Sequence, residues 1–335
     1  MKRIAINGFG RIGRLTFRLL MEKNDIEVVA INDLTDSKTL AHLLKYDSAQ
    51  GIWNKLITVD AEGFTIEGKK IKVMAIKNPL ELPWKDLKID VVIESTGSFT
   101  DSEKAKMHLQ AGAERVLISA PAKGNVQAIV LGVNDEKISD NSRIYSNASC
   151  TTNCLAPLVK VLDQNFGFKE GIMVTAHAYT ADQNLQDAPH RDLRRARAAA
   201  VNIVPTTSGA AEAVAEVYPQ VKGKLTGKAY RVPVITGSIV DLTCLLNKKV
   251  SEEEINAVFQ NAASTDFKNI ISYNTDPLVS SDIIGNPHSA IFDAPLTKVI
   301  GDIVNISAWY DNEAGYSNRL TELVGKIAEL PDPID

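Results

Sequence analysis

The 335-residue chain begins with the stretch that decides its fold: Lys2-Arg-Ile-Ala-Ile-Asn-Gly8-Phe-Gly10-Arg-Ile-Gly13. Residues 2–6 form a short apolar run typical of a buried strand, and the spacing that follows predicts a helix over 11–23. Three glycines at this junction match the pattern G-x-G-x-x-G. The first permits a tight turn, the second lets a pyrophosphate approach the backbone, and the third allows close packing of helix on strand. The stretch therefore predicts a dinucleotide-binding α/β unit.

The cofactor choice is indicated by the second expected strand, residues 26–31, which ends at Asn32-Asp33. Asp33 lies 20 residues after Gly13, where an acidic side chain can accept hydrogen bonds from ribose hydroxyls. Its charge would repel a 2′-phosphate, and the next three residues supply no Lys or Arg. The pattern favours NAD over NADP. The alternative is a glycine-rich turn that binds no dinucleotide.

The order of the expected strands and helices divides the chain into two parts. Up to about residue 148, strands alternate with helices, which predicts a doubly wound parallel sheet; the further strands are expected at 71–76, 90–95, 115–119, 128–132 and 143–146. A helix over about 150–165 then precedes alternating, strand-like stretches at 171–180, 225–232, 238–246 and 304–310. Antiparallel pairing is the natural interpretation of these. Helical spacing returns at 314–330.

Composition excludes several classes of protein. The formal charge is −4, from 37 basic and 41 acidic residues, which argues against a chain that coats nucleic acid. The N-terminus lacks the apolar run of a signal peptide, and no apolar stretch is long enough to span a membrane. Three cysteines cannot form a disulfide framework. We expect a cytoplasmic protein with reduced thiols.

One of these cysteines is the candidate nucleophile. Cys150, in Ser149-Cys-Thr-Thr-Asn-Cys154, is expected close to a helix N-terminus, whose partial positive charge favours the thiolate and lowers the thiol pKa. The neighbouring hydroxyls suit an anion. Cys154 lies four residues on, a spacing that fits neither a disulfide nor a metal site. Cys154 and Cys244 are expected to be buried apolar residues, and no metal is expected.

His177 is the histidine that lies inside a strand-like stretch, residues 173–180. A histidine close to a thiolate can stabilise it and act as a general base. The alternative is a histidine that only packs and forms a satisfied hydrogen bond. The sequence alone does not establish that His177 meets Cys150.

Arginines concentrate in a long polar segment, residues 181–203, that fits neither a helix nor a strand. Four of them fall within 190–197, where guanidinium groups could bind phosphate or carboxylate. For most of the four, an ion network at the surface or at a subunit interface is the preferred interpretation. Residues 206–211 and Arg231 are further candidate anion partners.

Five blocks of the chain resemble one family closely: Asn7–Arg14, Ser146–Cys154, His177–Thr180, Asp192–Ala199 and Trp309–Glu313. The family is that of the phosphorylating glyceraldehyde-3-phosphate dehydrogenases, and the resemblance runs along essentially the whole chain. It implies a Rossmann-type NAD-binding domain at 1–148, an α+β catalytic domain with a mostly antiparallel sheet at 149–313, and a C-terminal helix, 314–335, that packs back on the first domain. It also implies a homotetramer in which segment 181–203 reaches a neighbouring subunit's cofactor site.

The implied reaction converts glyceraldehyde 3-phosphate, NAD and inorganic phosphate to 1,3-bisphosphoglycerate and NADH, through a cysteine hemithioacetal and thioester. Cys150 would be the nucleophile and His177 the base. The residues implied to bind NAD are Gly8, Gly10, Arg11, Ile12, Gly13, Asp33, Lys77, Ser119 and Asn312. The residues implied to form two anion sites are Ser149, Thr151, Thr180, Arg195, Ser208, Gly209 and Arg231. The chain departs from the usual family pattern at Lys77, Ala188, Ser208, Glu212 and Ala314.

Three alternatives stay open at this point. A sister enzyme could oxidise another phosphorylated aldehyde such as erythrose 4-phosphate, although Arg195 and the pair Tyr179-Thr180 resemble the triose-phosphate site. A Cys/His acyl hydrolase would explain Cys150 and His177, but it would leave the glycine pattern and Asp33 without a role. A protein that binds NAD without catalysis would leave the cysteine and histidine unexplained.

Overall fold

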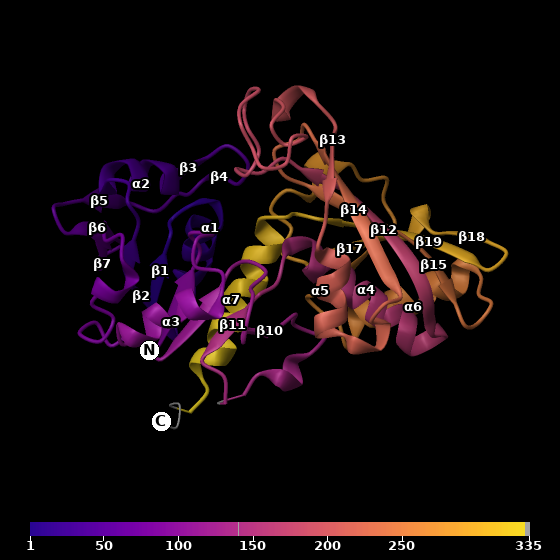
Figure 1. The fold of residues 1–335 in the computed structure, drawn as a ribbon, viewed down its shortest axis with the longest axis horizontal. Coiled ribbons are helices and arrows are strands. Elements are labelled where there is room, and N and C mark those ends of the chain that lie inside the picture. Colours follow the sequence, from indigo (N-terminus) through magenta and orange to yellow (C-terminus); the bar gives the residue numbers. More distant parts are fainter. Residues whose placement is uncertain (140, 332–335) are drawn as a thin grey trace. The chain divides into compact units, whose positions relative to one another are not determined.

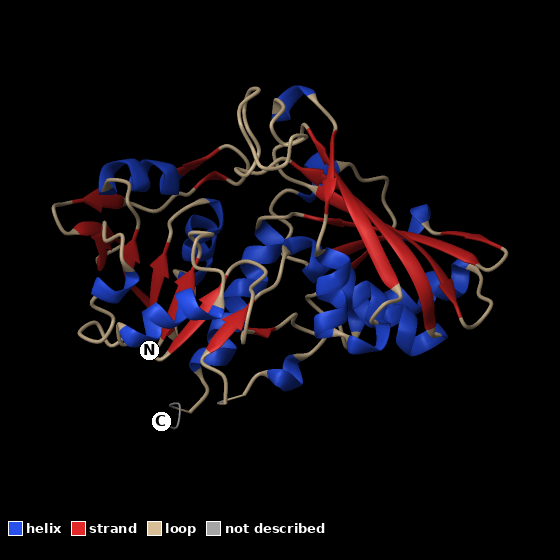
Figure 2. Ribbon diagram, viewed as in Figure 1, coloured by secondary structure: helices blue, strands red, loops and turns tan. Residues whose placement is uncertain are grey.

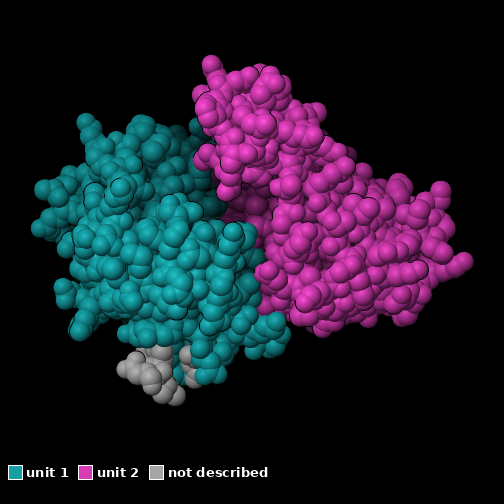
Figure 3. Space-filling view, viewed as in Figure 1, with its two compact units in different colours: residues 1–129, 135–148, 317–335 teal, residues 130–134, 149–316 magenta. Residues whose placement is uncertain are grey.

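The computed structural model describes residues 1–139 and 141–331. The chain separates into two compact units, coloured separately in Figure 3. The first comprises residues 1–129, 135–148 and 317–335, and the second comprises 130–134 and 149–316. Figure 1 follows each unit along the chain. None of the helices in the described ranges combines the length and apolar character needed to cross a bilayer.

The first unit is built on one sheet with the strand order β10-β11-β9-β8-β1-β2-β7-β6-β5 in its described part. Neighbours from β10 to β7 run parallel, and β7, β6 and β5 pair antiparallel. The strands are β1 (Lys2–Asn7), β2 (Ile26–Asn32), β5 (Ile57–Val59), β6 (Gly63–Ile66), β7 (Lys69–Met74), β8 (Val91–Glu94), β9 (Arg115–Ile118), β10 (Gln127–Ala128) and β11 (Ile144–Ser146), beside a small hairpin of β3 (Tyr46–Asp47) and β4 (Gly51–Ile52). The helices are α1 (Arg11–Leu20), α2 (Ser37–Lys45), α3 (Ser102–Gln110) and most of α7 (Ala314–Ala328).

Local chemistry accounts for these elements. Ile4, Ala5 and Ile6 are fully buried, as expected for a central parallel strand covered on both faces. Helices α2 and α3 begin after aspartates whose carboxylates accept hydrogen bonds from the first-turn N–H groups. Two expected elements run three residues or more past the observed end. The first helix ends at Leu20, and the strand expected at 128–132 is reduced to β10, because the chain then turns and the Val130 N–H donates to the Asn134 side chain (2.8 Å).

The second unit has a mostly antiparallel sheet with the order β13-β14-β12-β15-β19-β17-β16, and β18 pairs with β19. Only β12–β14 and β16–β17 run parallel among its described pairs. The strands are β12 (Phe168–Ala178), β13 (Val204–Thr207), β14 (Leu225–Val232), β15 (Ser238–Leu246), β16 (Ile271–Asn274), β17 (Ala290–Asp293), β18 (Lys298–Ile300) and β19 (Ile303–Tyr310). The helices are α4 (Cys150–Phe166), α5 (Ala210–Val217) and α6 (Glu252–Ser264). The predicted fold class, a mostly parallel sheet followed by a mostly antiparallel one, is confirmed.

Helix α4 organises this second unit. It packs against α5, α6 and strands including β12 and β15, and Figure 2 shows the helices gathered beside the long strands. Its apolar residues Leu155, Leu158 and Leu162 are fully buried, and the helix continues through Pro157. Burial anchors the helix, so the position of Cys150 at its first residue is fixed by the core.

Candidate active site

The entry into α4 holds Cys150 in a defined place. Ala148 adopts φ +53°, a left-handed conformation uncommon for a residue with a Cβ. Ser149 caps the helix, since its hydroxyl accepts the N–H of Thr152 (3.0 Å). Cys150 follows as the first helical residue and is half-buried. The turn therefore presents the thiol at the helix N-terminus, as the sequence predicted.

Strand β12 brings His177 to this thiol. The distance from His177 Nε2 to Cys150 Sγ is 3.3 Å. On the other side of the ring, Nδ1 lies 2.6 Å from the Ala178 carbonyl oxygen. A carbonyl oxygen can only accept, so Nδ1 carries the hydrogen and Nε2 turns its lone pair toward the thiol. The buried imidazole is thus set to accept the thiol proton.

Burial sets the ionisation of this pair. It raises the pKa of the Cys150 thiol, while the positive charge of Arg231 acts in the opposite direction. It also lowers the pKa of His177 to about 3, with a further contribution from Arg231. The expected net lowering of the Cys150 pKa is therefore wrong, because the cost of desolvating a thiolate exceeds the stabilisation by nearby charges and donors. Burial therefore disfavours the charged form of both groups.

One residue that builds the site was not predicted from the sequence: Tyr310, at the end of β19. Its hydroxyl lies 2.9 Å from the hydroxyls of both Thr151 and Thr175. Its ring meets that of His177 edge to face, with the ring centroids 5.9 Å apart. Tyr310 therefore ties α4, β12 and β19 together around the histidine. The signal was the strand alternation on 304–310, which could have shown that Tyr310 faces inward.

Two arginines occupy different surroundings in this unit. Arg231 on β14 is beside β12, and its Nη1 donates to the Ala178 carbonyl (3.2 Å) and the Thr180 hydroxyl (3.1 Å). Arg195 donates to Thr206 Oγ1 (3.0 Å) and is ion-paired with Asp182. The geometry groups Arg231 and Thr180 directly with the histidine strand.

The other candidate anion ligands are less closely grouped. Ser208 and Gly209 precede α5, and no hydrogen bond within the described residues ties them to Cys150. Thr151 follows Cys150 in the chain, and its hydroxyl is hydrogen-bonded to the hydroxyl of Tyr310. Arg197 pairs with Asp187 (2.8 Å), which agrees with an ion network for part of the arginine-rich segment.

The glycine-rich stretch lines a cleft of about 480 Å³ in the first unit. The residues lining it are Asn7, Gly8, Gly10, Asn32, Asp33, Leu34, Ile76, Lys77, Ser95, Thr96, Ser98 and Phe99. They follow the carboxyl ends of β1, β2, β7 and β8, where ligands bind in open α/β sheets. The cleft therefore lies at the position that the fold provides for a nucleotide.

The three glycines fit a bound dinucleotide for different reasons. Gly8 has φ +93°, and a Cβ there would lie 2.6 Å from the Thr96 nitrogen. A Cβ on Gly13 would lie 2.3 Å from the Gly8 carbonyl oxygen, so helix and turn pack closely. At Gly10 a Cβ would meet nothing within 4 Å, which leaves the backbone open to a phosphate. The residues present fit NAD.

Only some of the remaining predicted cofactor ligands line the cleft. Asp33 lines the cleft, and its two oxygens accept the N–H groups of Phe9 (2.7 Å) and Thr35 (2.9 Å). Arg11 and Ile12 belong to the first turn of α1, and the Arg11 guanidinium pairs with Asp47 (2.7 Å). Ser119 follows β9 outside the cleft lining. Asn312 belongs to the second unit, where its Oδ1 accepts from Ser238 (2.9 Å).

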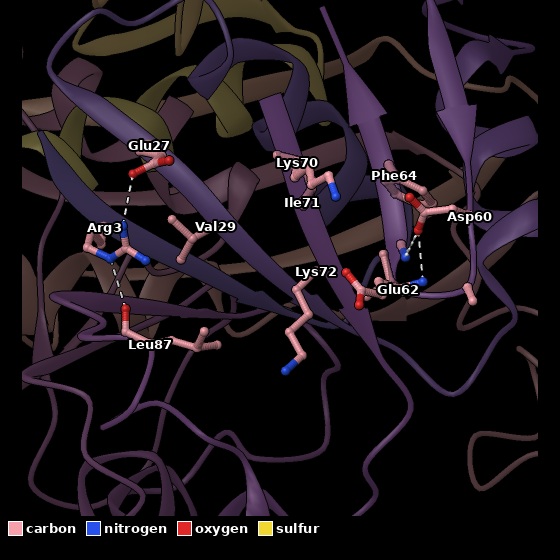
Figure 4. Close-up of a pocket in the computed structure, with 13 residues that line it drawn as sticks. Arg3, Glu27, Val29, Asp60, Glu62, Phe64, Lys70, Ile71, Lys72 and Leu87 are labelled. Carbon is pink, nitrogen blue, oxygen red and sulfur yellow. Dashed lines mark hydrogen bonds and ion pairs between the residues drawn. The ribbon is translucent and has the colours of Figure 1, made fainter. Parts of the chain in front are cut away.

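A second cavity in the first unit, of about 560 Å³, is a poorer candidate. It lies among Arg3, Glu27 and Lys70, each the second residue of its strand, and so at the amino ends of β1, β2 and β7. Figure 4 shows Arg3 held between Glu27 and the Leu87 carbonyl. Its lining mixes both charges and its arginine is already paired, so nothing there selects a ligand.

The cysteines outside the site behave as expected. Cys154 and Cys244 are buried free thiols, and burial raises the pKa of both, to about 12 for Cys244. Within the described residues, no group of three or more His, Cys, Asp or Glu is arranged to hold a metal ion.

Comparison with known proteins gives concordant matches along the chain. The family model described as "Glyceraldehyde 3-phosphate dehydrogenase, NAD binding domain" matches residues 2–102, and that described as "Glyceraldehyde 3-phosphate dehydrogenase, C-terminal domain" matches 149–312. The chain is 57% identical over 334 residues to a glyceraldehyde-3-phosphate dehydrogenase of Mycobacterium tuberculosis, covering 98% of each protein. It is 54% identical over 324 residues to glyceraldehyde-3-phosphate dehydrogenase 2 of Streptomyces avermitilis, covering 96% of this chain and 97% of the relative.

Proposed function

The chain belongs to the glyceraldehyde-3-phosphate dehydrogenase family, and from this premise we propose that Cys150 and His177 carry out its chemistry. The protein is an NAD-dependent dehydrogenase that oxidises glyceraldehyde 3-phosphate, with inorganic phosphate, to 1,3-bisphosphoglycerate. The observation that carries the proposal is the 3.3 Å distance between Cys150 Sγ and His177 Nε2.

The proposed sequence begins with proton transfer from the thiol to His177. The Cys150 sulfur then adds to the aldehyde carbon, and the imidazolium returns its proton to the new alkoxide, which gives a hemithioacetal. His177, neutral again, removes the hydroxyl proton as hydride leaves the same carbon. NAD supplies the hydride acceptor. The product of this step is a thioester on Cys150.

Phosphate completes the proposed cycle. One of its oxygens attacks the thioester carbonyl, the carbon–sulfur bond breaks, and the acyl phosphate leaves. The departing sulfur takes back the proton held by His177. The Cys150 backbone N–H, at the helix N-terminus, is the proposed donor to the oxyanion that forms twice in the cycle.

The proposed binding roles follow the same premise. Arg231 and Thr180 are supported as an anion site by their mutual hydrogen bond beside His177. The other proposed anion ligands are Ser149, Thr151, Arg195, Ser208 and Gly209. The proposed NAD ligands are Gly8, Gly10, Arg11, Ile12, Gly13, Asp33, Lys77, Ser119 and Asn312, of which the cleft lining supports Gly8, Gly10, Asp33 and Lys77.

A homotetramer is the proposed assembly. Large apolar side chains stand exposed on the sheet of the second unit (Ile172 and Ile303) and along segment 181–203 (Leu185 and Leu193, 80% and 82% exposed). Contiguous exposed apolar surface is typical of protein interfaces. Sedimentation equilibrium on the purified chain tests the assembly, and a monomer at working concentration would refute it. We propose the cytoplasm as its compartment, where Cys150 stays reduced.

The activity is tested by NADH absorbance with purified protein, NAD, glyceraldehyde 3-phosphate and phosphate. The signal is expected to require phosphate, or arsenate in its place, and to be lost in C150A while NAD binding persists. Turnover by C150A at the wild-type rate would refute the role of the cysteine. Comparing kcat/KM for glyceraldehyde 3-phosphate and erythrose 4-phosphate separates the two aldehyde substrates.

A further inference from the structure

A buried polar cluster lies behind the nucleotide cleft of the first unit, outside every role assigned above. Its centre is Glu94, the last residue of β8, which is 1% exposed. His108 on α3 and Trp84 are both fully buried beside it. Burying a carboxylate is costly unless donors surround it, so the arrangement around Glu94 calls for a reason.

The hydrogen bonds from Trp84 through His108 to Glu94 all have the same direction. The Trp84 indole N–H can only donate, and it lies 3.0 Å from His108 Nδ1, which must therefore accept. That leaves the hydrogen of a neutral imidazole on Nε2, which donates to Glu94 Oε2 (3.1 Å). The tautomer of His108 is thus fixed by the tryptophan behind it.

Four donors converge on the Glu94 carboxylate. Oε2 accepts from His108 and from the Asn7 amide (2.6 Å). Oε1 accepts from the Thr96 backbone N–H (2.8 Å) and from the Thr96 hydroxyl. With two donors at each oxygen, the site is built for a group that accepts at both oxygens, and an amide group in its place would turn an N–H toward one of these pairs.

Two of the three donor residues are themselves part of the cleft. Asn7 and Thr96 both line it, and the Asn7 Oδ1 in turn accepts from Asn32 (2.7 Å), another lining residue. The Thr96 nitrogen is the atom nearest to where a Cβ of Gly8 would stand, 2.6 Å away. The carboxylate therefore fixes the backbone against which the first glycine turn packs.

We propose that Glu94 is a positioning residue for NAD, which holds Asn7, Thr96 and through them the Gly8 turn in the geometry that binds the cofactor. His108 and Trp84 act behind it by orienting one of its donors. The inference rests on NAD occupying the cleft, and it does not depend on the roles proposed for Cys150 and His177.

The test measures NAD binding directly by titration calorimetry, without the aldehyde substrate. E94Q keeps the shape of the side chain, but its amide N–H would face N–H or O–H donors of the cluster. Buried polar groups would then lose their hydrogen bonds. We expect the Kd for NAD to rise about 10- to 100-fold. At saturating NAD, kcat and the KM for the aldehyde are expected to change much less than the KM for NAD.

A matched control lies next to the same strand, β8. Asp90 immediately precedes β8 at its other end, and it accepts the Arg3 N–H (2.6 Å) and pairs with Lys2 (3.5 Å). D90N removes a structural carboxylate from the same unit without touching the cleft, so it reports how far general destabilisation alone weakens NAD binding. Thermal unfolding of both apo variants gives the comparison.

The proposal holds if E94Q binds NAD at least tenfold more weakly while D90N, at a similar Tm loss, stays within about twofold of the wild type. It is overturned if folded E94Q binds NAD as the wild type does, or if D90N weakens binding equally. Should E94Q fail to fold, H108Q is measured against the same two criteria. Failure of the catalytic proposal would instead show in C150A turnover, with NAD binding intact.

Discussion

Replacing His177 with asparagine removes the proton acceptor beside Cys150 while keeping a polar side chain of similar reach. Nε2 already lies 3.3 Å from Sγ, so no rearrangement is needed for proton transfer in the wild type. The whole contribution of a positioned base, about 10²- to 10⁴-fold in rate, should be lost. This equals about 2.7 to 5.4 kcal/mol of transition-state stabilisation at 1.36 kcal/mol per tenfold.

Two assays follow this change. Initial rates of NADH formation give kcat, and alkylation by iodoacetamide gives the reactivity of the thiol as a function of pH. Burial raises the pKa of Cys150, so without an acceptor the thiolate forms only at alkaline pH. We expect alkylation of H177N near neutral pH to be slower than in the wild type and to accelerate toward high pH.

A matched control is H288N. His288 lies in the same unit, its Nδ1 is 2.9 Å from Asn286 Oδ1, and no role in the reaction is proposed for it. Wild-type kcat in H288N, with comparable Tm in both variants, would show that the loss is specific. A kcat for H177N within about twofold of the wild type would refute the base assignment, since a general base contributes far more than that.

Other predictions concern stability and cofactor choice. Folding lowers the pKa of His177 from 6.5 to about 3. Below about pH 6.5 the unfolded chain therefore binds a proton at this histidine, whereas the folded chain binds it only below about pH 3. Stability should therefore fall with acidification across this window, by about 3 kcal/mol at pH 4.5, and chemical denaturation of H177N should show a shallower decline. G8A should cost about 1–3 kcal/mol, because of its φ of +93° and its clash with the Thr96 nitrogen, whereas G10A should leave Tm unchanged and weaken NAD binding. Equal Tm losses for the two glycine variants would contradict this. D33S removes a charge that would repel a 2′-phosphate, so the ratio of kcat/KM for NADP to kcat/KM for NAD should rise about tenfold. An unchanged ratio would count against that role for Asp33.

Much of the fold could be predicted from the sequence where local signals are strong. Strands β14 and β15 match their predicted ranges, and in β15 burial alternates over all nine residues, which leaves a clear period of two. Short strands were not predicted from the sequence, among them β5, β16 and β18, because three or four residues show no detectable period. Residues 128–132 are apolar yet mostly outside a strand, since a side-chain contact from Asn134 ends the ladder there.

The candidate site divides in the same way. Local sequence placed Cys150 at a helix start, because the cap, the hydroxyls and the apolar face all lie within a few residues of it. Tyr310 and Glu94 had no such signal. Tyr310 acquires its role from contacts with Thr151 and Thr175, more than 130 positions away, and Glu94 from Asn7, 87 positions away.

The sequence by itself determined the nucleotide-binding turn, the cysteine and the family, because the residues that form each motif are neighbours in the chain and constrain one another locally. Only the tertiary structure decided which histidine meets the thiol, which way its tautomer points, and that burial raises rather than lowers the thiol pKa. The physical reason is that desolvation and long-range hydrogen bonds depend on what surrounds a group in space. That environment exists only after β12 and β19 pack against α4, and it sets whether the helix N-terminus or desolvation has the larger effect on the pKa of Cys150.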